Sequence, residues 1–260
     1  MPSPDTLPYQ LMDLGACPHG GPLADAHLLQ AAAQHPVACL WSAPQCLVVP
    51  RTYAAKPGFA QAQQTMNAQG WPVYVRQSGG GVVPQGAGIL NLSLARLFSG
   101  RPLDHSEDFY QQLCSIIASA LLFFGIEARA QAVEGSFCDG RFNLAVGNPA
   151  KKIAGTAQWW RRQTPASGAP VAGTTPSEQH IGLVHALILL DCDTDTVTRQ
   201  ANALEEALGS TRRYRADRIV SLDTLIPPEN RAQFQDRFHT RLIQCIPGGG
   251  IRLSQESPIS

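Results

Sequence analysis

The sequence has no excess of either charge, no long apolar run and no C-x-x-C pair. Twenty basic residues balance twenty acidic ones, which argues against nucleic-acid binding because phosphate backbones require clustered positive charge. The most apolar stretch, 183–190, contains His185 and stops at Asp191, well short of the roughly 18 apolar residues that a membrane helix needs. We therefore expect neither a nucleic acid nor a membrane as partner.

The first fifteen residues also lack the basic start and the apolar run of a signal peptide, which favours a cytoplasmic protein. The seven cysteines are odd in number and scattered, so no disulfide framework is indicated and a reducing compartment suits them. Cys17 and His19 are close enough to share a metal, but no second pair has matching spacing, so we expect none. Oligomeric state has no signal in the sequence, and a monomer is the starting assumption.

Hydrophobic periodicity predicts the secondary structure. Helices are expected at 22–35, 60–69, 106–124, 196–208 and 230–246. Strands are expected at 37–41, 46–49, 72–76, 89–97, 126–133, 142–146, 153–159 and 181–190. Turn residues between the first two strands predict a hairpin, and Ser106 is expected to cap the third helix. The stretch 163–179, rich in Pro, Gly, Ser and Thr, is expected to be a long loop and a candidate lid.

Many strands with a few helices between them predict an α/β or α+β fold, a mixed β-sheet flanked by helices. With 260 residues, 44% of them hydrophobic, the chain is long enough for one large core. We expect a single domain over 1–260, with its core at about 22–195 and a helical C-terminal segment at 196–260.

A glycine cluster follows the strand predicted at 72–76. Gly79, Gly80 and Gly81 permit positive φ and let a ligand lie directly against the backbone. Free N–H groups there would suit a carboxylate, a phosphate or an acyl carbonyl, and Arg76 adds a positive charge. The alternative is a glycine-rich hairpin with a surface arginine. The cluster matches neither a P-loop nor a dinucleotide-binding fingerprint.

A second cluster contains the cysteine that differs from the others. Most of the other cysteines sit in apolar runs and are typical of core positions, whereas Cys138 lies between Gly135 and Gly140. A reactive thiolate needs access and a nearby positive charge. Lys152 begins a predicted strand, Gly155 leaves room beside it, and its ammonium would favour the thiolate form. The alternatives are an inert loop cysteine and a lysine at a solvated strand end.

Together these segments resemble the catalytic domain shared by lipoate-protein ligases, octanoyltransferases and biotin-protein ligases. The similar segments are Arg76-Gln77-Ser78-Gly79-Gly80-Gly81, Gly88-Ile89-Leu90-Asn91-Leu92-Ser93, Lys152-Ile153-Ala154-Gly155-Thr156-Ala157-Gln158 and Val184-His185-Ala186. The resemblance covers roughly 22–195 and implies the class II biotin/lipoate ligase fold. It also implies a set of substrate-binding residues, namely Arg76, Ser78, Gly79, Gly80, Gly81, Asn91, Gly155, Thr156, Ala157 and His185.

One branch of this superfamily is the most similar. The segment 134–140, followed by Phe142-Asn143-Leu144, resembles the octanoyl-[glycine cleavage H protein] amidotransferases, whose nucleophilic cysteine matches Cys138. The resemblance implies catalysis by Cys138 and Lys152 without a cofactor, with the lysine stabilising the oxyanion. It implies lipoyl-domain proteins as partners, among them the glycine cleavage H protein and the acyltransferase subunits of 2-oxoacid dehydrogenases. His185 and His180 are candidate proton carriers.

Two alternatives remain open at this point. The first is an ATP-dependent lipoate-protein ligase, because the third glycine of the cluster, Gly81, resembles the sequence of those ligases. Such an enzyme would use ATP and Mg²⁺ to form lipoyl-AMP without a covalent cysteine intermediate. The other alternative is a non-catalytic relative that binds octanoate or lipoate without turnover.

Overall fold

The protein folds into two β-sheets with helices around them. The computed structural model describes residues 8–16, 22–163 and 178–248. The larger sheet has seven strands in the order β1-β2-β6-β10-β9-β8-β7, and the smaller has three in the order β4-β3-β5. The strands are β1 (Gln10–Ala16), β2 (Val37–Ser42), β3 (Cys46–Pro50), β4 (Val73–Arg76), β5 (Val83–Gln85), β6 (Ile89–Ser99), β7 (Arg129–Ala130), β8 (Leu144–Val146), β9 (Lys151–Gln163) and β10 (Gln179–Leu189). The helices are α1 (Pro22–Ala31), α2 (Arg51–Ala54), α3 (Phe59–Ala68), α4 (Pro102–Leu122), α5 (Thr194–Ala207) and α6 (Pro228–Cys245).

Strand β10 lies at the centre of the large sheet and pairs antiparallel with both β6 and β9 along its length. Its register places Leu187 between Asn91 of β6 and Gly155 of β9, and Asn91 in turn pairs with Trp41 of β2. Four strands thus bring four residues that are far apart in sequence into one row. All four line the cavity described below.

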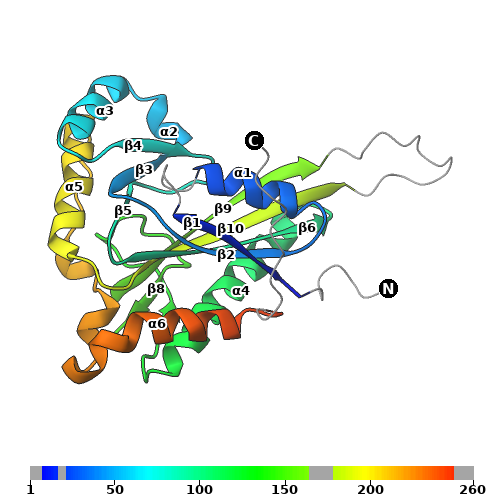
Figure 1. Cartoon of the computed structure of the whole chain (residues 1–260). Coiled ribbons are helices and arrows are strands. Elements are labelled where there is room, and N and C mark those ends of the chain that lie inside the picture. Colours follow the sequence, from blue (N-terminus) through cyan, green and yellow to red (C-terminus); the bar gives the residue numbers. More distant parts are fainter. Residues whose placement is uncertain (1–7, 17–21, 164–177, 249–260) are drawn as a thin grey trace.

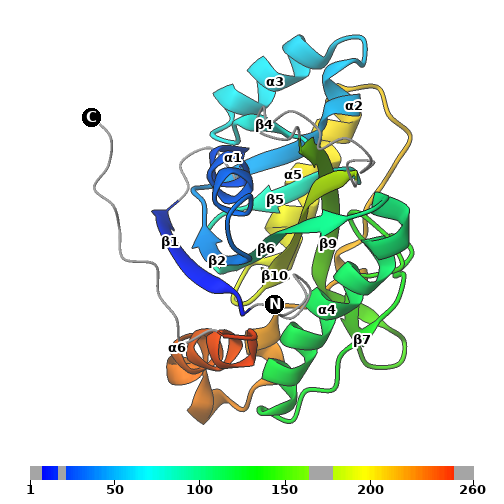
Figure 2. The same ribbon diagram turned by 90° about the vertical axis from the view of Figure 1, so that its right-hand side faces the viewer.

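Helices cover both faces of the large sheet. Helices α4 and α6 lie together on one face, and α1 and the small sheet with α2 and α3 lie on the other (Figures 1 and 2). The core is correspondingly divided. One cluster joins α4 and α6 to β6 and β10, a second joins the small sheet to α3 and α5, and a third joins α1 to β2 and β10. The predicted mixed sheet flanked by helices is therefore confirmed.

The predicted hairpin at 37–41 and 46–49 is wrong, because its two strands belong to different sheets. Strand β2 pairs with β1 and β6, whereas β3 pairs with β4 and β5. All five residues of β3 are buried, so this strand occupies the middle of the small sheet rather than the edge of a hairpin. The turn chemistry of 42–45 marks a change of direction but does not determine which strand will be the partner.

Three further expectations need correction. Only Arg129–Ala130 of the strand expected at 126–133 pairs with a neighbour, and both residues are exposed. Ser106 does not cap its helix, because α4 begins four residues earlier with a proline in its first turn, and the Ser106 hydroxyl instead donates to Gln158 Oε1 at 2.9 Å. Helix α1 ends at Ala31, short of the expected 35, and β1, α2 and β5 were not expected. Most of the candidate lid, 164–177, lies outside the described residues.

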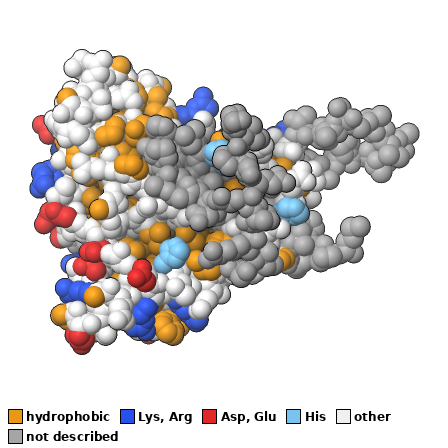
Figure 3. Space-filling view, in the orientation of Figure 1, with side chains coloured by type: hydrophobic (Ala, Val, Ile, Leu, Met, Phe, Trp, Pro, Cys, Tyr) orange, Lys and Arg blue, Asp and Glu red, His pale blue; other side chains and the backbone are white. Residues whose placement is uncertain are grey.

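The surface carries charges of both signs. On the face drawn in Figure 3, acidic and basic side chains are interspersed with hydrophobic ones. Among the described residues, no helix combines the length and the hydropathy needed to cross a membrane.

Gly88 is a position where the fold requires glycine, and it gives a prediction for stability. Its φ is +73°, and a Cβ there would lie 1.6 Å from the backbone oxygen of Asp191, which cannot move away cheaply. Its own carbonyl accepts from the N–H groups of Leu190 and Asp191, both at 2.9 Å. We expect Gly88→Ala to lower the free energy of unfolding by at least about 3 kcal/mol, measured by urea denaturation.

The matched control is Gly209→Ala. Gly209 also has positive φ, at +65°, but a Cβ there would meet nothing within 4 Å. Only the backbone term remains, so we expect a loss of about 1 kcal/mol. Equal losses in the two variants would show that the contact with Asp191 is not what requires glycine at position 88.

Candidate active site

A cavity lies between the two sheets and contains about 480 Å³ of empty space, part of it open to solvent. Both sheets contribute to it, the large sheet through β2, β6, β9 and β10 and the small one through all three of its strands. Its wall is mainly apolar, with a few polar groups. The lining residues are Asp25, Trp41, Val48, Arg76, Val83, Gln85, Asn91, Cys138, Gly155, Thr156, Ala157, His185, Ala186 and Leu187.

Arg76, at the end of β4, is buried and holds the glycine cluster in place. Its guanidinium donates to the carbonyl oxygens of Val48, Gly79 and Gly81, each at 2.8 Å. Burial lowers the pKa of Arg76, because the charged form loses its hydration, and these carbonyls replace that hydration in part. The alternative of a surface arginine beside a plain hairpin is therefore wrong, and Arg76 orders the loop.

The three glycines have different surroundings. A Cβ on Gly80, whose φ is +105°, would lie 2.5 Å from Cys138 Sγ. On Gly81 it would lie 3.2 Å from the Tyr214 hydroxyl and 3.3 Å from Arg212, whereas on Gly79 it would meet nothing within 4 Å. Gly80 is thus the position at which the cluster meets the thiol.

Cys138 occupies the loop between β7 and β8, is partly exposed and lines the cavity. Its φ is +56°, and it is the one non-glycine position with positive φ in the part of the chain that the structure describes. Such a conformation is uncommon for any residue other than glycine, so surrounding contacts must maintain it. One of them comes from Asn143, whose amide donates to the Cys138 carbonyl at 2.6 Å.

Lys152 supplies the other contacts, from a position that is fully buried. Its ammonium donates to the carbonyl oxygen of Phe137 and, at 2.9 Å, to that of Cys138. Burial lowers the pKa of Lys152 to about 8, against an opposing effect from Cys138 that raises it. The alternative of a lysine at a solvated strand end is therefore wrong.

Gly155 separates this ammonium from the cavity. A Cβ on Gly155 would lie 2.7 Å from Lys152 Nζ, and Gly155 itself lines the cavity. The room that the sequence predicted beside the lysine is therefore present. The charge lies just behind the cavity wall rather than in the cavity, since Lys152 is not among the lining residues.

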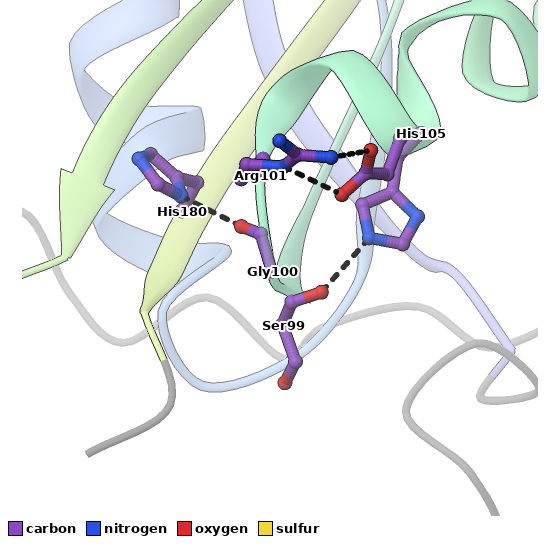
Figure 4. Close-up of polar contacts among 6 residues, drawn as sticks. Ser99, Gly100, Arg101, His105 and His180 are labelled. Carbon is purple, nitrogen blue, oxygen red and sulfur yellow. Dashed lines mark hydrogen bonds and ion pairs between the residues drawn. The ribbon is translucent and has the colours of Figure 1, made fainter. Parts of the chain in front are cut away.

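His185 of β10 stands on the same wall, in contact with the glycine segment. Its Nε2 lies 2.9 Å from Ser78 Oγ, and its Nδ1 faces Asp25 Oδ1 at 3.8 Å. The other candidate proton carrier, His180, lies near the opposite end of the same strand. Figure 4 shows that its ring points to the Gly100 carbonyl, which its Nδ1 contacts at 3.0 Å. His180 is not among the residues that line the cavity, so the structure favours His185 of the two.

The remaining predicted residues also lie at the cavity. Asn91 and Gln85 exchange two amide hydrogen bonds, of 2.9 and 3.0 Å, and so form a polar patch in a mostly apolar wall. Thr156 donates to the Phe142 carbonyl at 3.0 Å, and Ala157 pairs with His185 across the sheet. The predicted residues of the glycine segment lie beside the cavity but are not among the residues that line it, namely Ser78, Gly79, Gly80 and Gly81.

Several residues that the fold brings here could not be found from the sequence. Asp25 is a single acidic residue in the first turn of a predicted helix, Gln85 lies between two of the similar segments, and Asn143 stands in a segment that was chosen for its neighbours. No local pattern distinguishes them, because their roles depend on contacts between distant elements. Cys17 and His19 lie outside the described residues. Within the described ones, no group of three or more His, Cys, Asp or Glu side chains is arranged to hold a metal ion.

The geometry suits acyl-group chemistry. A partly exposed thiol, a buried ammonium bound to the same loop and a mainly apolar cavity meet at one place. A thiolate attacks a carbonyl carbon, and a fixed cation stabilises the charge that develops.

Comparisons with known proteins identify a matching family and several relatives. A family model described as the lipoyl protein ligase A/B catalytic domain matches residues 23–243. An uncharacterized protein of Cupriavidus necator is 44% identical over 237 residues, which are 88% of this chain and 91% of that one. The octanoyl-[GcvH]:protein N-octanoyltransferase of Kyrpidia tusciae is 33% identical over 195 residues, which are 75% of this chain and 64% of that enzyme.

Solved structures show the same fold at low sequence identity. Lipoate-protein ligase A bound with ATP superposes with a TM-score of 0.64 at 15% identity, over 98% of this chain and 90% of that one. A bi-partite lipoate protein ligase from Thermoplasma acidophilum, studied with its E2 lipoyl domain, gives a TM-score of 0.61 at 16% identity, over 98% and 88%.

The contact between Gly80 and Cys138 gives a prediction that is independent of substrate. A methyl group at position 80 must displace the thiol, because the two would be 2.5 Å apart. We expect Gly80→Ala to change the rate at which iodoacetamide alkylates Cys138 by at least about tenfold. The rate is measured by peptide mass spectrometry. Gly79→Ala, with open space around its Cβ, should leave the rate within about twofold of the parent protein. Equal alkylation rates in the two variants would show that Gly80 does not determine the position of the thiol.

Proposed function

The chain belongs to the family of lipoyl protein ligase A/B catalytic domains, and on that premise we propose that it is an octanoyl or lipoyl transferase that works through a Cys138 thioester. The family acts in protein lipoylation, as ligase or as transferase. The observation that carries the proposal is the position of Cys138. This partly exposed residue lines the cavity, and its backbone carbonyl accepts a hydrogen bond from the Lys152 ammonium. The name of the Kyrpidia tusciae relative points to the same activity.

The substrate in this proposal is an eight-carbon acyl chain or its lipoyl derivative. The cavity offers it an apolar wall that includes Trp41, Val48, Val83 and Leu187. Each buried CH₂ group contributes about 0.8 kcal/mol, so the chain supplies most of the binding free energy. In this proposal no cofactor is required, because the donor already carries the acyl group in a covalent bond that Cys138 exchanges for a thioester.

The first half-reaction acylates the cysteine. The Cys138 thiolate attacks the acyl carbonyl, a C–S bond forms, and the C–N bond to the donor amine breaks as that nitrogen takes up a proton. Lys152 has two roles in this proposal. Its hydrogen bonds hold the loop in the conformation that presents the thiol, and its charge, behind Gly155, stabilises the thiolate and the oxyanion.

The second half-reaction transfers the group to a lysine of an acceptor protein. We assign lipoyl-domain proteins as acceptors, among them the glycine cleavage H protein and the acyltransferase subunits of 2-oxoacid dehydrogenases. This assignment rests on the names of the relatives, one of which acts on GcvH and another of which was studied with an E2 lipoyl domain. A cytoplasmic monomer is part of the same proposal.

The second candidate is an ATP-dependent lipoate-protein ligase. The observation in its favour is the similarity of the whole fold to lipoate-protein ligase A bound with ATP. On this route ATP and Mg²⁺ would activate free lipoate, and Cys138 would not become acylated.

An acylation assay separates the two functions. We expect the protein, incubated with an octanoylated lipoyl domain, to gain the mass of one octanoyl group on Cys138 without ATP. Cys138→Ala should lower transfer to a second lipoyl domain at least about 1,000-fold, because the nucleophile is lost. The matched control is Cys245→Ala, which alters another partly exposed cysteine, at the end of α6, and should retain normal transfer. Transfer that requires ATP and survives Cys138→Ala would establish the ligase instead.

The pKa of Lys152 predicts a pH dependence. Burial lowers this pKa to about 8, so the ammonium form is present below pH 8 and is lost as the pH rises through that value. Because the ammonium holds the loop and stabilises negative charge, the single-turnover rate of Cys138 acylation should fall above about pH 8. The rate is measured by intact-mass spectrometry in rapidly quenched samples. A rate that keeps rising to pH 10 would contradict the role of the charged lysine.

A further inference from the structure

Two buried polar atoms face each other on the cavity wall, and neither makes a hydrogen bond. Among the described residues, Asp25 Oδ1 and His185 Nδ1 are both shielded from solvent and make no hydrogen bond. They lie 3.8 Å apart, and both residues line the cavity that contains Cys138. Leaving a buried carboxylate oxygen unpaired costs considerable free energy, so such a pair indicates that a ligand completes the site.

The chemistry of the pair identifies the class of ligand. Of the described residues that line the cavity, Asp25 is the one carboxylate, and it is 4% exposed. His185 is oriented by Ser78, whose hydroxyl occupies Nε2 at 2.9 Å. When Nε2–H donates to Ser78, Nδ1 remains as an acceptor directed toward Asp25. Two acceptors at this separation suit two N–H donors on one nitrogen, with hydrogen bonds of roughly 2.7–3.2 Å.

We propose that Asp25 and His185 form the site for the acceptor's primary amine, in which the carboxylate binds the ammonium and the imidazole removes its proton. This inference rests on the proposed transferase function, and it assigns to two residues the step that Cys138 and Lys152 do not perform. Lys152 cannot serve as this base in the same way, since its ammonium is bound to two carbonyl groups behind the wall.

The site lies within reach of the thioester. Ser78, which holds His185, is two residues from Gly80, and Gly80 is the glycine in contact with Cys138 Sγ. The glycine segment therefore connects the amine site to the nucleophile. Arg76 is the other charged group on this wall, and its guanidinium is engaged by three backbone carbonyls.

The step balances with the groups present. The ammonium bound to Asp25 transfers one proton to His185 Nδ1, and the free amine attacks the thioester carbonyl. A C–N bond forms, the C–S bond breaks, and the second proton of the nitrogen goes to the departing Cys138 sulfur. In the opposite half-reaction the nitrogen that leaves the donor takes up one proton from the protonated imidazole and one from the Cys138 thiol. The amine therefore departs as an ammonium, and both residues end the cycle as they began.

A two-nucleophile experiment tests this site. The octanoyl-Cys138 thioester is first formed with the octanoylated donor domain and isolated, and its decay is then followed by intact-mass spectrometry. One sample receives a lipoyl domain with a free lysine, and the other receives hydroxylamine, a nucleophile that is uncharged at neutral pH. We expect Asp25→Asn and His185→Gln to slow transfer to the lysine about 100-fold or more while changing release by hydroxylamine less than about threefold.

His180→Gln is the matched control. It alters another histidine of β10 whose ring contacts the Gly100 carbonyl away from the cavity, so both rates should remain those of the parent protein. Normal transfer to lysine in both site variants would overturn the amine site. So would equal slowing with the two nucleophiles, which would mean that the substitutions only distort the pocket. If the parent protein forms no thioester, the proposed function itself fails, and this outcome is distinct from the other two.

Discussion

The site depends on one interaction, the hydrogen bonds from the buried Lys152 ammonium to two consecutive carbonyls of the cysteine loop. These carbonyls belong to Phe137 and Cys138. The two hydrogen bonds hold Cys138 in a conformation with a positive φ of 56°. A backbone in that region returns to a commoner conformation unless its surroundings prevent it. The lysine therefore does more than place a charge near a thiol, because it also maintains the conformation that directs the thiol toward Gly80 and the cavity.

A second cation has a similar function at the glycine cluster. Arg76 binds three carbonyls of the small sheet and the glycine cluster, as Lys152 binds two of the cysteine loop. In both cases the hydrogen bonds of the buried cation go to backbone oxygens rather than to a carboxylate. The thiol lies between two loops, each fixed by a cation, and both cations favour negative charge on sulfur or on an acyl oxygen.

Much of this arrangement could be predicted from the sequence, and the rest depends on tertiary contacts. Cys138 was distinguished by its glycine neighbours, and Lys152 by Gly155 beside it. The burial of Arg76 and of Lys152 could not be predicted, since the same residues would be typical of a surface turn. Short apolar runs identify β2 and β3 as strands but do not specify that they join different sheets. Asp25 reaches the cavity only because α1 packs across β10, and no local pattern encodes that contact.

The most direct test of this account is a single-turnover acylation assay on Lys152→Met, with folding followed in parallel by urea denaturation. Methionine fills a similar volume but provides neither the two hydrogen bonds nor the charge. The account predicts cooperative unfolding with acylation of Cys138 slowed by at least about 100-fold. Acylation at the parental rate in a folded Lys152→Met protein would contradict it. Other groups would then hold the cysteine loop and stabilise the negative charge on the sulfur or on the acyl oxygen.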